Sequence, residues 1–298
     1  MITCELCGGL GNQLFQIFTT IAYALRNDTS FYFKKYEHGL ETQNIGTSKL
    51  ITKRCPYWVD FLSELSCNLS DDFNNTMTIH EQRFKYDEIR MLSDSEKINN
   101  NICLMGYFQS PKYFADFEQN IYDLLKIREK QQFIKNHSNI NFDNIQTISM
   151  HFRLGDYKLL PKMFNILNVN YFINALKYVL FKSKSDKLTT VLYFCEDESI
   201  PEVENMINII KSRFTSITFS RCGQDLTDWE QMLLMSVCDH NVIANSTFSW
   251  WGAYLNQNNR KIVCYPSKWF GPNLHITHET IDLCPKTWYM IPDISFNN

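Results

Sequence analysis

The stretch TISMHFRLGDYKLLP, Thr147 to Pro161, joins a strand pattern to a polar cluster. Its first six residues, TISMHF, are typical of a buried strand. Three ionisable side chains, His151, Arg153 and Asp156, stand at the end of this strand and just beyond it, with Leu154 between them. Charged groups are seldom placed beside a core for stability alone. We therefore expect this strand end to hold a ligand.

Beyond this stretch, strand patterns and helix patterns alternate up to about residue 266. The expected strands are 147–152, 189–195, 216–220, 241–245 and 261–266, and the expected helices are 170–181, 201–214, 226–238 and 246–255. Alternation at this spacing predicts an α/β fold with a parallel, doubly wound sheet and right-handed connections.

The N-terminal half has the same character but is less regular. It contains an expected strand at 1–7, a glycine loop, and a helix that follows Asn12 as its expected N-cap. A further strand at 101–108 and a helix at 111–127 follow, whereas residues 36–100 show no clear periodicity. The Asn-rich segment 135–146 is the expected linker. We predict two domains, residues 1–143 and 144–298, with a ligand cleft between them.

Composition excludes several classes of protein. The 298 residues are 44% hydrophobic and 20% charged, which is typical of a globular chain rather than a disordered one. The net charge is −3 and there is no basic block, so a nucleic-acid-binding protein is not expected. The pair Cys4 and Cys7 lacks a second CxxC or a His pair, which argues against a zinc site and for reduced thiols. Without a signal peptide or a long apolar span, a soluble cytoplasmic protein is expected.

Two further polar clusters follow expected strands. In GGLGN, residues 8–12, the glycines allow backbone N–H groups to approach an anion at a helix start, although a tight turn needs glycine as well. In Asn245, Ser246 and Thr247, hydroxyl and N–H groups can form a second anion site, or Ser246 or Thr247 can be an ordinary N-cap. Phe248 can stack on a ligand or fill an interface.

The cluster around Arg153 also has two interpretations. Its guanidinium can pair with phosphate, while the imidazole and the carboxylate orient it or contact a base. Alternatively, Arg153 and Asp156 form a salt bridge that braces a loop, and His151 is a core residue. Taken together, the three clusters indicate a diphosphate held between the domains. No convincing metal-ligand set is present, because Asp71–Asp72 and residues 196–198 are the only acidic candidates. The first pair is typical of a solvated turn. The second run follows an expected strand and either lies near the ligand or, more commonly for such a run, faces solvent.

Five motifs together resemble the glycosyltransferase family 11 fucosyltransferases, the α-1,2-fucosyltransferase family. They are GGLGNQLFQ (8–16), GYFQSPKYF (106–114), HFRLGDY (151–157), NSTFSWWGAYL (245–255) and YPSKWF (265–270). Their order and separations are similar to those of the family, and they cover nearly the whole chain. The resemblance implies a GT-B-like fold of two Rossmann-type domains with an interdomain cleft. The N-terminal domain would lie on the acceptor side and the C-terminal domain would bind the nucleotide sugar.

The implied reaction is inverting transfer of L-fucose from GDP-fucose to a glycan hydroxyl, O2 of a terminal galactose, without a metal or other cofactor. Arg153 matches the first Arg of the family's HxRRxD element and would hold the β-phosphate, with His151 against the guanosine and Asp156 ordering the loop. Arg153 and Asp156 are the expected catalytic residues. The expected donor-binding residues are Gly11, Asn12, His151, Arg153, Asn245, Ser246, Thr247 and Phe248.

Two roles stay open at this level. Guanine needs an acceptor for its N–H groups, and Asp228 and Glu230 are candidates, although acidic residues in a first helical turn also suit the helix dipole. The acceptor hydroxyl needs a general base, for which Asp156, His151 and an acidic residue of the N-terminal region are candidates.

The chain departs from the family pattern at Leu154, where a second Arg is usual. This leaves two alternatives to an α-1,2-fucosyltransferase: the same scaffold with another GDP-sugar or linkage, or a non-catalytic nucleotide- or glycan-binding homologue. The Golgi members carry an N-terminal membrane anchor, which is not expected here, because the sequence resembles the soluble microbial or viral type.

Overall fold

The chain is described here from a computed structural model, which covers residues 1–36, 40–43, 51–54 and 56–293. It divides into two compact units, residues 1–128 with 278–285, and residues 129–277 with 286–298. The two-unit α/β organisation is as predicted, but the chain passes between units at 128/129 rather than at 143/144, and residues 278–285 return to the first unit. The expected cleft between the units stays a prediction.

The predicted linker is placed differently because helix α4 (Ile127–His137) occupies its first residues. The sequence of α4 is polar on average, as that of a linker would be, although its apolar residues recur at helical spacing. Its buried Gln131 donates from Nε2 to Ser236 Oγ (2.8 Å) and to the carbonyl of Leu255 (2.9 Å), both in the second unit. These bonds explain why the helix belongs to that unit.

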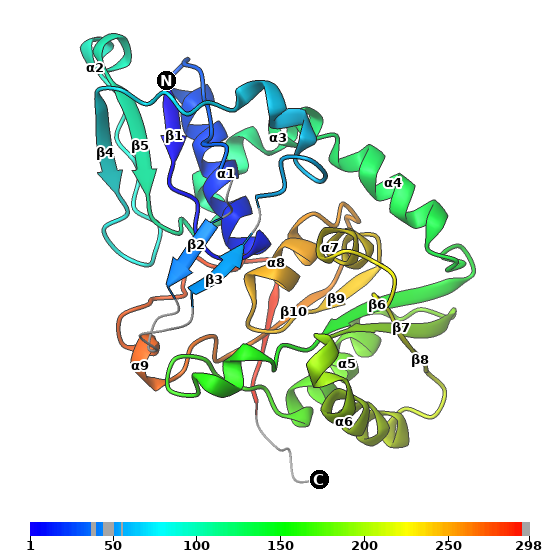
Figure 1. Ribbon diagram of the computed structural model, residues 1–298. Coiled ribbons are helices and arrows are strands. Elements are labelled where there is room, and N and C mark those ends of the chain that lie inside the picture. Colours follow the sequence, from blue (N-terminus) through cyan, green and yellow to red (C-terminus); the bar gives the residue numbers. More distant parts are fainter. Residues whose placement is uncertain (37–39, 44–50, 55, 294–298) are drawn as a thin grey trace. The chain divides into compact units, whose positions relative to one another are not determined.

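The second unit is built on a six-stranded parallel sheet in the order β11-β10-β9-β6-β7-β8 (Figure 1). Its strands are β6 (Ile145–His151), β7 (Leu188–Phe194), β8 (Thr218–Arg221), β9 (His240–Val242), β10 (Val263–Pro266) and β11 (Tyr289–Ile291). Its further helices are α5 (Val169–Ser183), α6 (Ile200–Arg213), α7 (Asp228–Ser236), α8 (Thr247–Tyr254) and α9 (Pro272–His275), with 3₁₀ turns η4 (Asp156–Leu159) and η5 (Asp197–Ser199). The predicted strand–helix alternation is therefore confirmed, and β11 is an addition to it.

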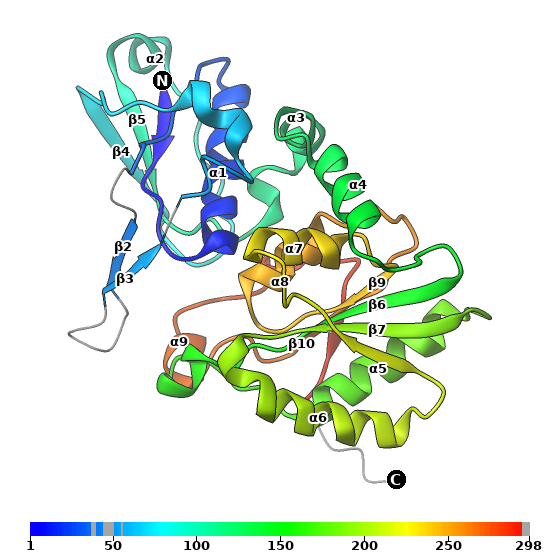
Figure 2. The same ribbon diagram turned by 45° about the vertical axis from the view of Figure 1, so that its right-hand side comes forward.

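Helices α5 and α6 cover one face of this sheet, and α7 and α8 cover the other (Figures 1 and 2). The chain moves from β6 outward to β7 and β8, then crosses back beyond β6 to β9, β10 and β11. Since crossovers between parallel strands are right-handed, this change of direction places the later helices on the opposite face. Both faces of the central strands are covered, so β6 is an almost continuous buried run.

The first unit holds a three-stranded parallel sheet in the order β1-β5-β4 and an antiparallel pair, β2 with β3. Its strands are β1 (Ile2–Cys4), β2 (Leu40–Gln43), β3 (Ile51–Arg54), β4 (Thr76–His80) and β5 (Asn101–Met105). Its helices are α1 (Leu10–Arg26), α2 (Asp94–Asn99) and α3 (Glu118–Leu124), with 3₁₀ turns η1 (Ser63–Asn68), η2 (Pro111–Tyr113) and η3 (Ala115–Phe117). Part of the span 36–100, which showed no clear periodicity, lies outside the described residues.

One predicted helix, 111–127, is wrong as a single element, because it is divided into η2, η3 and α3. The break falls at Phe114, whose backbone is not helical (φ −135°). The buried Phe114 ring packs edge-on against Phe18 of α1 at 5.4 Å between centroids. This tertiary contact outweighs local helix propensity.

Two further observations concern membrane-spanning helices and disulfide bonds. Within the described ranges, no helix has the length and apolar content needed to cross a bilayer. The cysteines of the same ranges are free thiols.

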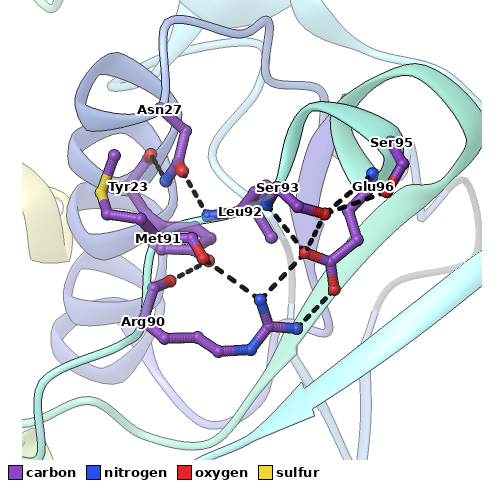
Figure 3. A network of polar contacts seen from close by, with 8 residues as sticks. All are labelled: Tyr23, Asn27, Arg90, Met91, Leu92, Ser93, Ser95 and Glu96. Carbon is purple, nitrogen blue, oxygen red and sulfur yellow. Dashed lines mark hydrogen bonds and ion pairs between the residues drawn. The ribbon is translucent and has the colours of Figure 1, made fainter.

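A polar network fixes the end of α1 to the segment before α2 (Figure 3). Asn27, fully buried, donates from Nδ2 to the carbonyl of Tyr23 (2.8 Å) and accepts at Oδ1 from the N–H of Leu92 (2.9 Å). The Tyr23 hydroxyl donates to the Arg90 carbonyl (2.8 Å), and the Arg90 guanidinium pairs with Glu96 of α2. The network joins segments about 65 residues apart and stabilises the first unit.

Asn27→Ala is expected to lower the free energy of unfolding by about 2 kcal/mol, because the buried Leu92 N–H would lose its acceptor. The measurement is the urea unfolding midpoint. Asn99→Ala is the matched control, since Asn99 is exposed at the end of α2 and should leave the midpoint unchanged. Equal midpoints for the two variants would contradict the role given to Asn27.

Candidate functional site

The change of chain direction in the second unit lies between β6 and β9, which are hydrogen-bonded neighbours. The connections leave in opposite directions from these two strands, so the segments after their carboxyl ends diverge. In open α/β sheets, ligands bind at this position, beyond the carboxyl ends of the two strands where the chain direction changes. Two of the predicted clusters follow these two strands: His151 to Asp156 after β6, and Asn245 to Phe248 after β9. The structure therefore brings together residues about 90 positions apart.

Arg153 is held by two carboxylates. Its Nη1 lies 2.6 Å from Glu196 Oε1 and its Nη2 lies 2.8 Å from Asp156 Oδ1. Its guanidinium carbon lies 5.3 Å from the centroid of the Tyr157 ring. Burial would lower the pKa of Arg153, but Glu196 above all, with Tyr157 and Asp156, raises it overall. The guanidinium is thus a fixed, permanent cation, and the salt bridge that we considered as an alternative is present.

For Glu196, the sequence left two interpretations open, a residue near the ligand or part of a solvated acidic run, and the structure favours the first. Its side chain is only 18% exposed. The signal that identifies it is strand register: His151 pairs with Phe194, so Arg153 and Glu196 each stand two residues beyond a paired position. Because β6 and β7 are neighbouring parallel strands that end at the same level, residues two positions beyond their ends lie close together.

His151 is buried, and the centroid of its ring lies 5.4 Å from the centroid of the Phe248 ring. Burial, helped by the charge of Arg153, lowers the pKa of His151 from its ordinary 6.5 to about 3. The imidazole is therefore neutral at physiological pH. A base this weak is poorly matched to taking a proton from a hydroxyl near neutral pH, so His151 is disfavoured as the general base.

Acidification is expected to destabilise the protein through His151. Because its folded pKa lies below the unfolded value, the unfolded state takes up a proton first as the pH falls below 6.5, and stability is lost from there towards pH 3. Between pH 7 and pH 5 we expect His151 to account for about 2 kcal/mol of lost unfolding free energy. Urea titrations at both pH values should show a smaller loss in His151→Asn. His240, whose pKa burial also lowers, contributes equally to both proteins.

An identical loss in wild type and His151→Asn would show that His151 is protonated in the folded state. Proton-detected titration of the imidazole gives the same answer independently, since a buried neutral ring shows no chemical-shift change between pH 5 and pH 8.

Buried polar atoms without a hydrogen-bond partner gather around this strand edge. They are His151 Nδ1, Arg153 Nε, Asn165 Nδ2, Ser199 Oγ and Asn245 Oδ1, none of which finds a partner in the described part of the chain. Such atoms are rare in folded proteins, because each one has lost its water without a replacement. Their concentration here indicates a site prepared for a polar ligand.

The loop after β9 is held firmly. Asn245 donates from Nδ2 to the carbonyls of Asn165 and Trp269 (2.8 Å each), and its own carbonyl accepts from the Tyr157 hydroxyl (3.0 Å). Ser246 is the N-cap of α8, and its hydroxyl accepts from the N–H of Phe248, so the ordinary N-cap predicted as one of its two roles is present. Thr247 is the first residue of α8 and is half-buried. Asn245 thus organises the loop and keeps only Oδ1 for a ligand.

Leu154 does not belong to the polar cluster. Its side chain is 2% exposed and packs in the hydrophobic core that includes Met150, Phe152 and Tyr171. Its backbone N–H lies 3.4 Å from Glu196 Oε2. The apolar character of Leu154 therefore follows from packing, and an effect of this departure on donor choice stays a prediction.

Asp228 and Glu230 lie at the start of α7. Glu230 forms a capping box, accepting from the N–H (2.8 Å) and hydroxyl (2.7 Å) of Thr227. Asp228 Oδ1 accepts from the N–H of Trp229 (2.8 Å). These bonds are those of an ordinary helix start, and both bonds of Glu230 use Oε2. A role of Asp228 or Glu230 toward guanine stays a prediction.

In the first unit, Gly9 is the N-cap of α1, so the predicted N-cap Asn12 is wrong; Gly11 and Asn12 lie in the first turn. Asn12 Oδ1 accepts from Nε2 of Gln109 (3.0 Å), which joins the GGLGN and GYFQS motifs. Gly8 has φ +77°, and a Cβ there would lie 2.4 Å from the Asn12 amide, so only glycine fits. Within this unit the two motifs therefore meet at the carboxyl ends of β1 and β5.

Glu81 is an acidic residue of the first unit that the sequence did not single out. It follows β4, and its two carboxylate oxygens accept from the N–H groups of Tyr107 (2.8 Å) and Phe108 (3.0 Å). Burial raises its pKa above the ordinary value. Phe108 has φ +51°, a strained conformation that these bonds support.

Across the described ranges, no group of three or more His, Cys, Asp or Glu side chains is arranged to hold a metal ion. The expectation of a metal-independent reaction stays a prediction.

A family model, Glycosyl transferase family 11, matches residues 1–281. The chain belongs to glycosyl transferase family 11. The resemblance drawn from the five motifs is thereby confirmed, and the two α/β units with parallel sheets are the GT-B-like organisation that it implied.

Two relatives of this family 11 chain come from Escherichia coli. Over 184 residues it is 32% identical to the O-antigen biosynthesis glycosyltransferase WbnK, a match that covers 59% of this chain and 58% of that protein, less than two thirds of its length. It is 25% identical over 316 residues to the Alpha-1,2-colitosyltransferase, covering 98% of this chain and 99% of that protein.

Solved structures of fucosyltransferases are also similar. POFUT1 in complex with GDP-fucose matches with a TM-score of 0.48 and 10% identity, over 89% of this chain and 97% of that one. NodZ from Bradyrhizobium matches with a TM-score of 0.42 and 12% identity, over 85% and 93%. These scores are low, and the assignment to family 11 rests on the family model.

Proposed function

We propose that the chain is an inverting fucosyltransferase that moves L-fucose from GDP-fucose to O2 of a terminal galactose, forming an α-1,2 linkage without a metal. The observation that carries this proposal is the set of unsatisfied polar atoms in the segments after β6, β7 and β9, beside a fixed guanidinium. Membership of family 11 supports the reaction class, and the relative named Alpha-1,2-colitosyltransferase supports the linkage.

Arg153 would bind the diphosphate of the donor. Its pair with Asp156 is the weaker of the two, because the Asp156 side chain is 51% exposed and that of Glu196 only 18%. A phosphate can therefore replace Asp156 at Nη2 while Glu196 keeps the guanidinium oriented. As fucose leaves, negative charge grows on GDP, and a preoriented cation stabilises it without reorganising.

The other residues would bind and orient the donor. The neutral His151, flanked by Phe248, would contact the guanosine, and the N-terminus of α8 with Ser246 and Thr247 would add N–H and hydroxyl groups at the phosphates. Asn245 Oδ1 is free to accept from the donor. Since His151 is disfavoured as the base, Asp156, released from Arg153, or a carboxylate of the first unit would take the acceptor proton.

A second donor is favoured by one observation: the relative similar over 98% of this chain is named for colitose transfer. Colitose lacks one hydroxyl that L-fucose carries. A site that hydrogen-bonds this hydroxyl discriminates strongly against the deoxy sugar, whereas an apolar contact discriminates weakly. The ratio of kcat/KM for the two donors therefore identifies the natural one.

The test is a transfer assay with GDP-L-fucose, GDP-colitose, GDP-mannose and UDP-galactose, each with galactose-terminated and 2-deoxygalactose-terminated oligosaccharides and with EDTA present. We expect transfer from a GDP-linked donor to the first acceptor only, with an α-1,2 product by NMR. Equal transfer to the 2-deoxy acceptor would overturn the linkage. Calorimetric GDP binding without transfer from any donor would instead favour a non-catalytic homologue.

A further inference from the structure

A groove of about 680 Å³ lies in the second unit at the amino ends of the sheet strands. Its lining includes Gln146 at the start of β6, Lys187 before β7, Asp239 before β9, Ile262 before β10 and Tyr289 at the start of β11. The cluster around Arg153 follows the other end of β6, about 20 Å away along the strand. The groove is therefore separate from the proposed donor site.

The charge of this groove is strongly positive. Lys182, Lys187, Arg260 and Lys261 line it, and Asp239 is the acidic residue among its lining. The Asp239 carboxylate already accepts from the N–H (2.7 Å) and hydroxyl (3.0 Å) of Thr147. The groove thus carries a net positive charge in a chain whose net charge is −3.

Three of these cations have no carboxylate partner among the described residues: Lys182, Lys187 and Arg260. Elsewhere in the described chain, cations such as Lys35 and Arg90 pair with Asp71 and Glu96. Cations in the last turn of a helix suit its dipole, which accounts for Lys182 at the end of α5. It does not account for Lys187 and Arg260, which lie in loops.

The cations are presented by an ordered loop and a packed helix end. Asn258 donates from Nδ2 to the Asp239 carbonyl (3.2 Å) and accepts at Oδ1 from the N–H of Arg260 (2.9 Å). Lys182 lies 5.9 Å from the centroid of the Tyr289 ring. The backbone that presents Arg260 is therefore already ordered, so little backbone order would have to be created on binding.

We infer that this groove binds a phosphate-bearing ligand. Two lysines and an arginine without a carboxylate partner among the described residues offer charge-assisted hydrogen bonds to phosphate oxygens, and Lys187 Nζ also donates to the carbonyl of Asp143 (2.8 Å). The Ser183 and Ser185 hydroxyls lie in the same lining. The phosphate can belong to a lipid headgroup or to a soluble molecule. The apolar side chains next in sequence to two of the cations, Phe181 (72% exposed) and Leu188 (76% exposed), make a lipid source worth a separate arm of the test.

The experiment measures the binding of two probes, each at low and at physiological salt. Binding to vesicles of phosphatidylcholine with 30 mol% phosphatidylglycerol is measured by co-sedimentation, with pure phosphatidylcholine vesicles as the control. Binding of inorganic pyrophosphate is measured by calorimetry. The proteins are wild type, the triple variant Lys182→Glu, Lys187→Glu, Arg260→Glu, and a control triple in the first unit with the same change of charge, Lys34→Glu, Lys97→Glu, Lys126→Glu. Arg153→Lys is included to separate this groove from the donor site.

We expect wild type, the control triple and Arg153→Lys to bind at least one probe, with binding weakened by salt, and the groove triple to bind it at least about tenfold more weakly. Vesicle binding alone identifies a lipid headgroup, and pyrophosphate binding alone a soluble phosphate. The groove triple should transfer sugar to a soluble acceptor at the wild-type rate. Phosphate binding by the groove and sugar transfer are therefore tested by separate measurements, and either proposal can fail without the other. If the triple variant is unstable, Arg260→Ser alone, at an exposed position, replaces it.

Absence of wild-type binding to both probes overturns the inference. An equal loss in the control triple also overturns it, because the effect would then be one of net charge. If Arg153→Lys loses binding of the probe and the groove variants keep it, the probe binds at the donor site, and this result also overturns the inference.

Discussion

Arg153→Lys is expected to lower the rate of sugar transfer about a hundredfold to a thousandfold, with folding unchanged. The guanidinium pairs with Glu196 through Nη1 and with Asp156 through Nη2, so it is fixed at two points. A lysine ammonium keeps the charge but is a compact point charge, which cannot hold Glu196 and a phosphate in the same planar arrangement. The loss should appear in kcat, because the interaction strengthens as charge builds on the leaving GDP.

The measurement is steady-state transfer from the preferred GDP-sugar, with kcat and KM determined separately. Arg213→Lys is the matched control, since Arg213 lies exposed at the end of α6 and should leave both constants unchanged. Turnover of Arg153→Lys within a few fold of wild type would remove Arg153 from the proposed mechanism.

Leu154→Arg, which introduces the second arginine of the family pattern, is expected to cost about 3 to 5 kcal/mol of unfolding free energy. Leu154 is 2% exposed within the core of the second unit. An arginine there would place an uncompensated charge among apolar side chains, because Glu196 is already paired with Arg153. The effect is therefore one of stability rather than of donor affinity.

The urea unfolding midpoint measures this cost. Leu159→Arg serves as the control, because Leu159 is 73% exposed in the same loop and should tolerate the change. An unchanged midpoint for Leu154→Arg, together with tighter GDP binding, would return Leu154 to the phosphate site and contradict the packing assignment.

Much of the fold was predictable because the second unit repeats one pattern. Parallel strands covered on both faces are apolar runs, and the amphipathic helices between them carry their own periodicity. The errors fall where tertiary contacts dominate: α4 has a polar sequence but is tied to the second unit by Gln131, and the helix expected at 111–127 breaks where Phe114 packs on Phe18.

The candidate site was predictable only in part. The residues after β6 and β9 were recognisable because polar groups stand at strand ends, and their proximity follows from the parallel sheet. Glu196 was left open, since a run of acidic residues beyond a strand is indistinguishable from a solvated turn until the pairing of His151 with Phe194 is known. For Asp228 and Glu230, the candidates for guanine, the structure shows the local bonds of a helix start, which their sequence position also allows, and the guanine role stays a prediction.

The sequence by itself determined the α/β class, the family, and which strand ends carry polar residues, because these follow from local periodicity and from motifs that are continuous in the chain. Only the tertiary structure decided which way each side chain in HFRLGDY faces. Arg153 turns to Glu196 and Asp156, while Leu154, one residue later, turns into the core. The direction of a loop side chain depends on strand register and packing against residues far away in the chain, which no local pattern records.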